Sequence, residues 1–245
     1  MKIALNGASG RMGQALESLI RQHPDYEVVA RFDHTNPLLS AHDMDVMQQA
    51  DVVIDFSHPS VILDHIHRYC LWGFNAVIGT TGWYDALPQV RDWVEEGQIG
   101  LLYAPNFSMG VAMLVRALRS VMPVLEQLPE FDAYVHEWHH TGKVDSPSGT
   151  AIKLAQTILD GLSRKTHLQP ETQQGAIDPA ALHVTSTRVG YVFGEHYVGL
   201  DSPHEALTFR HVAKNRAVFA AGALRSAAWL LQKSGLYTLE DVLGG

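Results

Sequence analysis

Residues 2–13 read Lys-Ile-Ala-Leu-Asn-Gly-Ala-Ser-Gly-Arg-Met-Gly, and this stretch decides the fold of the first half of the chain. The apolar run before Gly7 is typical of a buried strand. Apolar residues then recur at the spacing of one helical face, at Met12, Leu16, Leu19 and Ile20. Between strand and helix, glycines at every third position permit a tight bend and a close approach to a pyrophosphate group, which the helix N-terminus attracts. The stretch therefore predicts a dinucleotide-binding turn.

A second predicted strand, residues 26–32, leads to Asp33, which lies 20 residues beyond Gly13. An acidic residue at about this distance from the glycine turn binds the ribose hydroxyls of the adenosine in dinucleotide-binding domains. Asp33 is therefore the candidate ribose ligand. The alternative is an ordinary carboxylate at the exposed end of a strand.

Strands and helices continue to alternate up to residue 107. The pattern predicts strands at 51–57, 75–78 and 98–103 and helices at 58–71 and 85–96. Short connections between alternating elements favour a right-handed, doubly wound parallel sheet, in which ligands bind beyond the carboxyl ends of the strands. The loops that occupy this edge begin at Gly7, Asp33, Phe56, Gly79 and Ala104.

After Phe107 the pattern changes to an α+β arrangement on an open, mixed sheet. It predicts helices at 108–127, 147–161 and 216–232, strands at 131–138, 183–189, 195–200 and 206–211, and a long loop at 163–180. The outer face of this sheet is a candidate surface for contacts between subunits and is expected to carry Tyr134, Thr185, Tyr197 and Phe209. The last helix is apolar on nearly all sides, so we expect it to be buried against the first domain.

Residues 136–151 read His-Glu-Trp-His-His-Thr-Gly-Lys-Val-Asp-Ser-Pro-Ser-Gly-Thr-Ala. The imidazoles of His139 and His140 and the ammonium group of Lys143 are proton donors. The following Ser-Gly-Thr turn stands where a helix begins, and the N–H groups at such a position bind carboxylates. The segment predicts a pocket for a small anionic substrate that is protonated during the reaction. A solvated polar loop is the alternative.

Composition narrows the classes of function. The chain has 245 residues, 46% of them hydrophobic, which is enough for one large domain or two modest ones. A formal net charge of −8 without basic runs argues against a general nucleic-acid-binding protein. No apolar run is long enough to span a membrane, and the single cysteine, Cys70, cannot form an internal disulfide. We therefore expect a cytoplasmic protein with neither a membrane nor a nucleic acid as its partner.

No metal site is expected at the histidines of this segment. His136, His139 and His140 lie close together in the sequence, but no fourth Cys, Asp or Glu ligand occurs at a spacing typical of zinc sites.

Several motifs occur in a fixed order along the chain. They are Gly-Ala-Ser-Gly-Arg-Met-Gly at 7–13, Asp-Phe-Ser at 55–57, Gly-Thr-Thr-Gly at 79–82, Asn-Phe-Ser-Met-Gly-Val at 106–111, His-His-x-x-Lys-x-Asp-Ser-Pro-Ser-Gly-Thr-Ala at 139–151, Arg-x-Gly at 188–190, Gly-Glu-His at 194–196 and Asp-Val-Leu at 241–243. With these motifs the chain resembles the 4-hydroxy-tetrahydrodipicolinate reductase (dihydrodipicolinate reductase) family over essentially its whole length.

The resemblance implies a fold and an activity. The family reduces 4-hydroxy-tetrahydrodipicolinate to tetrahydrodipicolinate with NADH or NADPH, in lysine and diaminopimelate biosynthesis. It implies an α/β chain whose Rossmann-type dinucleotide-binding domain comprises residues 1–107 and 217–245. Residues 108–216 would form the domain that binds the dicarboxylate substrate and assembles a homotetramer.

The resemblance also implies roles for individual residues. The coenzyme would lie against Gly7, Ala8, Ser9, Gly10, Arg11, Met12, Asp33, Gly79, Thr80, Thr81, Ala104, Pro105, Asn106 and Phe107. The catalytic proton donors would be His139 and Lys143. The substrate would be bound by His140, Gly149 and Thr150, together with Ser148 at the same helix start. The chain departs from the family pattern at Asn6, at Pro105 and in the short segment between Asp33 and Asp51.

Coenzyme preference depends on opposing charges near the adenosine. Asp33 accepts hydrogen bonds from ribose hydroxyls but repels a 2′-phosphate. Arg11 and Arg31 are cations within reach of such a phosphate. We expect NADH to be used at least as well as NADPH. Two other functions stay open: another two-domain nicotinamide dehydrogenase of amino-acid metabolism, and a non-catalytic dinucleotide-binding redox sensor.

Overall fold

The computed structural model describes residues 1–38, 41–170 and 172–244. The chain divides into two compact units, one formed by residues 1–109 with 216–245 and the other by residues 110–215. Each unit contains its own sheet. The predicted α/β class, with a parallel Rossmann-like sheet and a second, mixed sheet, is confirmed.

The first unit is built on a six-stranded sheet in the order β11-β5-β4-β3-β1-β2, and every neighbouring pair is parallel. The strands are β1 (Lys2–Asn6), β2 (Glu27–Phe32), β3 (Val52–Asp55), β4 (Ala76–Ile78), β5 (Gly100–Tyr103) and β11 (Gly235–Thr238). The strand order reverses between β1 and β3. A reversal of this kind opens a crevice at the carboxyl ends of the two strands, where ligands bind in doubly wound sheets.

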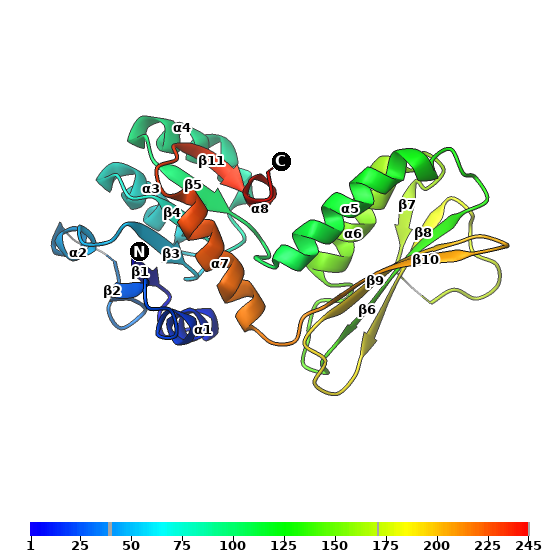
Figure 1. The fold of residues 1–245 in the computed structure, drawn as a ribbon, viewed down its shortest axis with the longest axis horizontal. Coiled ribbons are helices and arrows are strands. Elements are labelled where there is room, and N and C mark those ends of the chain that lie inside the picture. Colours follow the sequence, from blue (N-terminus) through cyan, green and yellow to red (C-terminus); the bar gives the residue numbers. More distant parts are fainter. Residues whose placement is uncertain (39–40, 171, 245) are drawn as a thin grey trace. The chain divides into compact units, whose positions relative to one another are not determined.

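Helices cover both faces of this sheet (Figure 1). They are α1 (Arg11–Ile20), α2 (Ala41–Met47), α3 (Ile62–Trp72), α4 (Leu87–Gly97), α7 (Ala217–Leu230) and α8 (Leu239–Val242), with a 3-10 turn, η1 (Tyr84–Ala86), before α4. Helix α1 packs against α7, and α3 packs against α4. Helix α7 also contacts β3, β4 and β5, so the expectation that the last helix is buried against the first domain is confirmed.

The second unit is built on a five-stranded sheet in the order β10-β9-β6-β8-β7. Its strands are β6 (Asp132–His139), β7 (His167–Gln169), β8 (Ala181–Arg188), β9 (Glu195–Asp201) and β10 (Ala206–Val212). Strand β6 is parallel to β8 and antiparallel to β9. Two helices, α5 (Met109–Leu125) and α6 (Gly149–Gly161), lie on one face of the sheet (Figure 1) and bury the apolar side chains that point towards them.

The opposite face of the second sheet carries aromatic side chains. Tyr134, Thr185 and Tyr197 share this outer face, as predicted from alternation along the strands. The prediction for Phe209 is wrong. Phe209 pairs with Val198 of β9 and packs against the apolar core under the helices, because it is one position out of step with the outward-facing residues of β10.

Four elements were not predicted, and each is short: α2, β7, β11 and α8. Helix α2 lies in the polar stretch after Asp33, and strand β7 lies in the segment predicted as a loop. Strand β11 pairs with β5 at the edge of the first sheet. Elements of three to seven residues contain too few periods of hydrophobicity to be recognised in a sequence.

A buried polar network lies at the carboxyl end of β3. The carboxylate of Asp55 is fully buried. Its Oδ2 accepts a hydrogen bond from the Tyr69 hydroxyl (2.8 Å) and lies 3.1 Å from His65 Nδ1, while its Oδ1 accepts the N–H of Ser57 (2.8 Å). Burial alone would raise the pKa of Asp55, but the hydrogen bonds from His65 and Ser57 outweigh it and hold the pKa below its ordinary value.

Asn6, at the end of β1, connects this network to the glycine turn. Its amide nitrogen donates to the Tyr69 hydroxyl (2.9 Å), and its Oδ1 accepts the N–H of Gly7 (3.0 Å). Asn6, a departure from the family pattern, therefore joins the first residue of the turn to the buried carboxylate.

We predict that Asp55→Asn lowers the free energy of unfolding at neutral pH by about 1.5–3 kcal/mol, the usual contribution of hydrogen bonds to a charged group. Because the folded-state pKa of Asp55 is depressed, its stabilisation is fully present above the ordinary value of 3.8 and is lost as the pH falls through the lower folded value. Below about pH 4, the wild type should therefore lose stability more steeply than the variant. Urea unfolding at a series of pH values measures both effects. Asp92→Asn, at an exposed position on α4, is the matched control and should behave like the wild type. A variant as stable as the wild type at neutral pH would contradict the prediction.

Candidate active site

The glycine turn connects β1 to α1 and brings the helix start close to β3. Gly7 has a φ of 77°, and a Cβ atom there would lie 2.4 Å from the carbonyl oxygen of Phe56. A Cβ at Gly13 would lie 2.4 Å from the carbonyl oxygens of both Gly7 and Ala8. Only glycine fits at these two positions. The resulting backbone cradle fits a pyrophosphate group, which needs a close approach to the main chain.

The first turn of α1 supplies hydrogen-bond donors to this cradle. The N–H groups of Gly7 and Ala8 are already bonded to the Phe32 carbonyl (2.9 and 3.0 Å), which fixes the turn beside the end of β2. The first helical N–H groups, from Arg11 to Gly13, have no partner within the helix. They point beyond the carboxyl edge of the sheet, where the helix dipole favours an anion.

Asp33 follows β2 at the same edge. Its Oδ1 accepts the N–H and hydroxyl of Thr35 (2.8 and 2.7 Å) and the N–H of Asn36 (3.2 Å). These hydrogen bonds, with a further one from the Ser9 side chain, hold the pKa of Asp33 well below its usual range. The carboxylate is therefore ionised at neutral pH, and it lies beside the residues of the glycine turn.

Arg31 is held away from this carboxylate by an ion pair. Its guanidinium donates to Glu17 Oε1 on α1 through Nη2 (2.7 Å) and Nε (3.0 Å). The side chain is half exposed, so it is attached to the helix surface and not to the end of β2.

The two remaining loops predicted to contact the coenzyme end at the same edge. The N–H of Gly79 donates to the Asp55 carbonyl (2.8 Å), and Thr80 Oγ1 lies 3.5 Å from the Asp55 carboxylate. The ring of Phe107 is buried, with its centroid 5.7 Å from that of Phe56. The first unit therefore gathers its predicted coenzyme residues from four loops at one edge of one sheet.

In the second unit, His139 is the last residue of β6 and points to the helix-covered face. It is buried, and its Nδ1 lies 3.3 Å from Oε2 of Glu137, two residues earlier on the same face. A Cβ at Gly194 would lie 3.1 Å from His139 Nε2, so glycine at that position leaves space beside this nitrogen.

Ser148 begins helix α6 next to these groups. Its hydroxyl accepts the N–H of Ala151 (3.2 Å), and its own N–H donates to Glu137 Oε1 (2.9 Å). Gly149 and Thr150 form the next positions of the first helical turn, where N–H groups have no partner within the helix. The turn predicted to bind a carboxylate is therefore a helix N-terminus anchored to β6.

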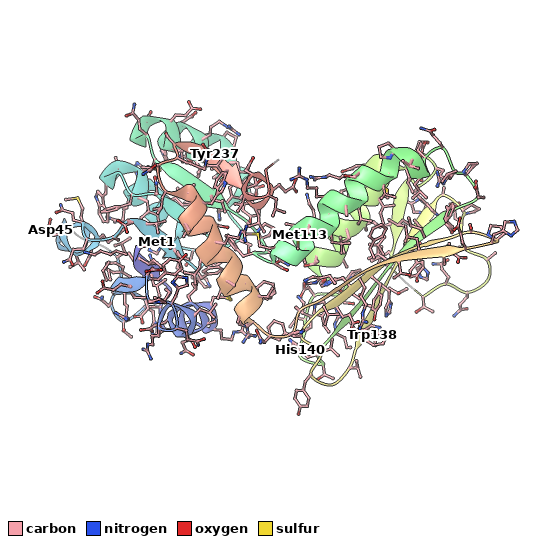
Figure 2. All side chains as sticks on the ribbon, in the orientation of Figure 1. Met1, Asp45, Met113, Trp138, His140 and Tyr237 are labelled. Atoms are coloured by element: carbon pink, nitrogen blue, oxygen red, sulfur yellow. The ribbon has the colours of Figure 1, made fainter. Side chains whose placement is uncertain are left out.

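Lys143 lies in the loop between β6 and α6 and forms an ion pair with Asp145. Burial raises the pKa of Asp145, but hydrogen bonds from Lys143 and from the N–H of Gly149 lower it overall, so this carboxylate is ionised. His140 directly follows the end of β6 (Figure 2), and its carbonyl accepts the N–H of Lys143 (3.1 Å). All the predicted catalytic and substrate-binding residues thus lie between the end of β6 and the start of α6.

Two residues that complete this site, Arg188 and His196, belong to the motifs quoted from the sequence but were given no role there. Arg188, on β8, donates to Glu137 Oε1 (3.0 Å) and to the carbonyl of Asp145 (2.7 Å). His196, on β9, has its ring centroid 5.2 Å from that of His139. Burial and the charge of His139 lower the pKa of His196 to about 4, so it is neutral at pH 7. Glu137 carried a signal in the sequence, because it is a charged residue at a core-facing position of an alternating strand.

The histidines considered for a metal site do not converge. His136 lies on the outer face of the sheet, where its Nδ1 is 2.6 Å from Thr185 Oγ1. Ligand atoms of Glu137, His139 and His196 lie within 4.8 Å of one another instead. Arg188 already contacts the Glu137 carboxylate, and a guanidinium at this distance opposes a second cation.

Among the helices that the structure describes, none is long and apolar enough to cross a membrane.

Comparisons with known proteins agree with the motifs. Residues 1–107 match the family model described as dihydrodipicolinate reductase, N-terminus, and residues 110–243 match the one described as dihydrodipicolinate reductase, C-terminus. The 4-hydroxy-tetrahydrodipicolinate reductases of Neisseria meningitidis serogroup C (strain 053442) and Neisseria gonorrhoeae (strain NCCP11945) are each 34% identical to the chain. Each match covers 100% of this chain and 97% of the relative.

Solved structures give the same result. A dipicolinate-bound dihydrodipicolinate reductase from Paenisporosarcina sp. TG-14 is 25% identical, with a TM-score of 0.80 over 98% of both chains. A DAP dehydrogenase of C. glutamicum in complex with DAP shares the fold at 15% identity, with a TM-score of 0.56 over 98% of this chain and 93% of that one. The family predicted from the motifs is confirmed, and a Rossmann-like sheet in a reductase family implies a nicotinamide coenzyme. The chain belongs to the dihydrodipicolinate reductase family.

Proposed function

We propose that the chain reduces 4-hydroxy-tetrahydrodipicolinate to tetrahydrodipicolinate with NADH or NADPH, a step of lysine and diaminopimelate biosynthesis in the cytoplasm. One observation carries the proposal: a buried imidazole, a lysine and a helix N-terminus gather in one unit, while the other unit presents a glycine turn shaped for a dinucleotide. Relatives of this name that align along the whole chain support the same reaction.

The first unit would bind the coenzyme, which supplies a hydride when bound. The turn from Gly7 to Met12 holds the pyrophosphate, and Asp33 binds the adenosine ribose. The loops at 79–81 and 104–107 line the nicotinamide.

The second unit would bind and protonate the substrate. Loss of the 4-hydroxyl group as water gives the substrate a conjugated C=C–C=N system. Hydride addition to one end of this system moves an electron pair to the other end, which then takes up a proton. His139 and Lys143 are placed to supply that proton, and a nearby cation lowers the barrier as negative charge develops. The turn from Ser148 to Thr150 and the side chain of His140 hold the substrate carboxylates.

Hydride transfer also requires the two sites to meet. We place the hinges of this movement near Phe107 and near Arg216, close to the points where the chain passes from one unit to the other. For assembly, we propose a homotetramer that forms through the outer face of the second sheet. Tyr134 and Trp138 support this surface, because both are large, exposed side chains on the same face of β6.

The first test is a coenzyme-oxidation assay. Purified protein mixed with NADH or NADPH and the cyclic substrate should consume the reduced coenzyme, followed by its absorbance, and EDTA should leave the rate unchanged. If the protein binds the coenzyme but does not oxidise it with the substrate, the result would favour a redox sensor. Turnover of a different amino-acid derivative would favour another dehydrogenase. Activity that disappears with the chelator and returns with zinc would refute the mechanism.

Removing either proton donor should slow the reaction strongly. His139→Ala and Lys143→Ala should each lower kcat by about 10²- to 10⁴-fold, the range typical of a positioned acid or base. The dissociation constant of NADH should not change, because both residues lie outside the first unit. His204→Ala, at an exposed position between β9 and β10, is the control and should retain full activity. If His139→Ala kept most of its turnover, the assignment of the proton donor would be wrong.

NADH should be used at least as well as NADPH. The ionised Asp33 carboxylate repels a 2′-phosphate, and Arg31 is engaged by Glu17, which leaves Arg11 as the nearby cation of the turn. The kcat/KM ratio for the two coenzymes, measured at one ionic strength, tests this preference. Asp33→Asn should shift the ratio towards NADPH, while an advantage of about tenfold for NADPH in the wild type would contradict the prediction.

A further inference from the structure

We propose that Glu137 is the positioning residue of this site: one of its carboxylate oxygens fixes the proton-donating imidazole, and the other fixes the turn that binds the substrate. The inference rests on the proposed function for its consequences in catalysis. Its structural core, the coupling of Glu137 to the tautomer of His139, is measurable without turnover.

Glu137 Oε1 is saturated by donors. It accepts hydrogen bonds from the N–H of Ser148 (2.9 Å), the hydroxyl of Ser186 (2.8 Å) and Nη2 of Arg188 (3.0 Å). The bond from Ser148 anchors the first residue before α6 to β6. The bond from Arg188 extends to the loop of Lys143, because the same Nη2 also donates to the carbonyl of Asp145 (2.7 Å).

Glu137 Oε2 is in the opposite situation. It is buried and has no hydrogen-bond partner among the described residues, and the same holds for Nδ1 of His139. The two atoms lie only 3.3 Å apart. A small rotation of either side chain completes a hydrogen bond between them, and an unpaired buried carboxylate oxygen strongly favours that bond.

This hydrogen bond would determine how His139 works. When the N–H at Nδ1 donates a hydrogen bond to Glu137, Nε2 faces the space beside Gly194. Nε2 then carries a lone pair in the neutral ring and a proton in the charged ring. The fixed negative charge also stabilises the protonated ring, which is the form that donates a proton to substrate. Glu137 itself stays ionised, because the adjacent His139 ring and the hydrogen bonds from Ser148 and Ser186 outweigh the effect of burial on its pKa.

The other charged and titratable neighbours do not replace Glu137 in this role. His196 Nε2 lies farther from Oε2, at 3.7 Å, and is 3.3 Å from the Ser148 hydroxyl. Arg188 is bonded to Oε1, and Lys143 is paired with Asp145. These two cations also make the carboxylate a poor site for a metal ion, so the close contact between Glu137 and His139 is best explained as a carboxylate–imidazole pair.

The test uses the full chain with ¹⁵N-labelled histidine. In the wild type, the ring nitrogen shifts of His139, assigned with a His139→Gln variant, should report the tautomer protonated at Nδ1. In Glu137→Gln, the amide oxygen takes over the donors of Oε1, so the NH₂ group faces Nδ1 and donates to it. The ring should then switch to the tautomer protonated at Nε2. A wild type protonated at Nε2 would overturn the proposal without any variant.

Kinetics provide the second readout. Glu137→Gln should lower kcat by about 10- to 100-fold, as the loss of a supporting carboxylate usually does. The kcat–pH profile should also differ from that of the wild type, because the neutral amide cannot balance a positive charge on the ring. The affinity for NADH should stay constant.

Glu195→Gln is the matched control. Glu195 lies on the neighbouring strand β9, is buried like Glu137, but pairs with Arg210 and Tyr197 on the outer face. Its variant should keep the wild-type tautomer of His139 and the wild-type pH profile. Ser186→Ala removes one donor to Oε1 and should leave the tautomer of His139 unchanged.

Glu137→Gln with an unchanged tautomer and pH profile would refute the proposal, and so would equal changes in Glu195→Gln. If Glu137→Gln fails to fold, Glu137→Asp provides the test, because it keeps the negative charge but moves the carboxylate away from His139 by one methylene group. Full kcat and an unchanged tautomer in that variant would refute the proposal, and a reduced kcat with a mixed tautomer would support it. A wild type that shows the predicted tautomer but oxidises no coenzyme with the substrate would refute the proposed function alone.

Discussion

Burial of an ionised carboxylate costs free energy that only hydrogen bonds and counter-charges recover, and both units of this chain are organised around such a group. In the first unit, the hydrogen bonds to Asp55 tie β3 to α3 and, through Asn6, to the glycine turn. In the second unit, Glu137 ties β6 to β8 and to the start of α6. Each carboxylate lies at the point where its sheet meets a predicted ligand-binding loop, so the stability of the fold and the geometry of the site depend on the same contacts.

The sequence predicted most of the fold because its central strands are nearly continuous apolar runs and its long helices show a clear period. It did not predict α2, β7, β11 and α8, which are too short to show a period. Strand β11 also depends on pairing with β5, which is distant in the sequence. The error at Phe209 has a similar origin. Alternation shows that two faces exist, but only pairing with Val198 of β9 shows which face Phe209 joins.

The candidate site was predicted where its residues are contiguous and missed where they are not. His139, Lys143 and Ser148 lie in one segment, so a motif identifies them together. Arg188 and His196 come from strands β8 and β9, and only the order of strands in the sheet brings them beside β6. The ion pair of Arg31 with Glu17 was not predicted from the sequence either, because it joins β2 to α1 through side chains alone.

The pairing of Asp145 with Lys143 and with the N–H of Gly149 has a consequence for selectivity. In the free chain, the Asp145 carboxylate already lies against Lys143 and against the N–H of Gly149, one of the groups proposed to receive a substrate carboxylate. A ligand must therefore displace a tethered competitor of the same chemistry, and its affinity is the difference between two similar interactions. A small monocarboxylate gains little from this exchange. A dicarboxylate, which carries a second anchoring group, would lose less of its affinity in the same exchange.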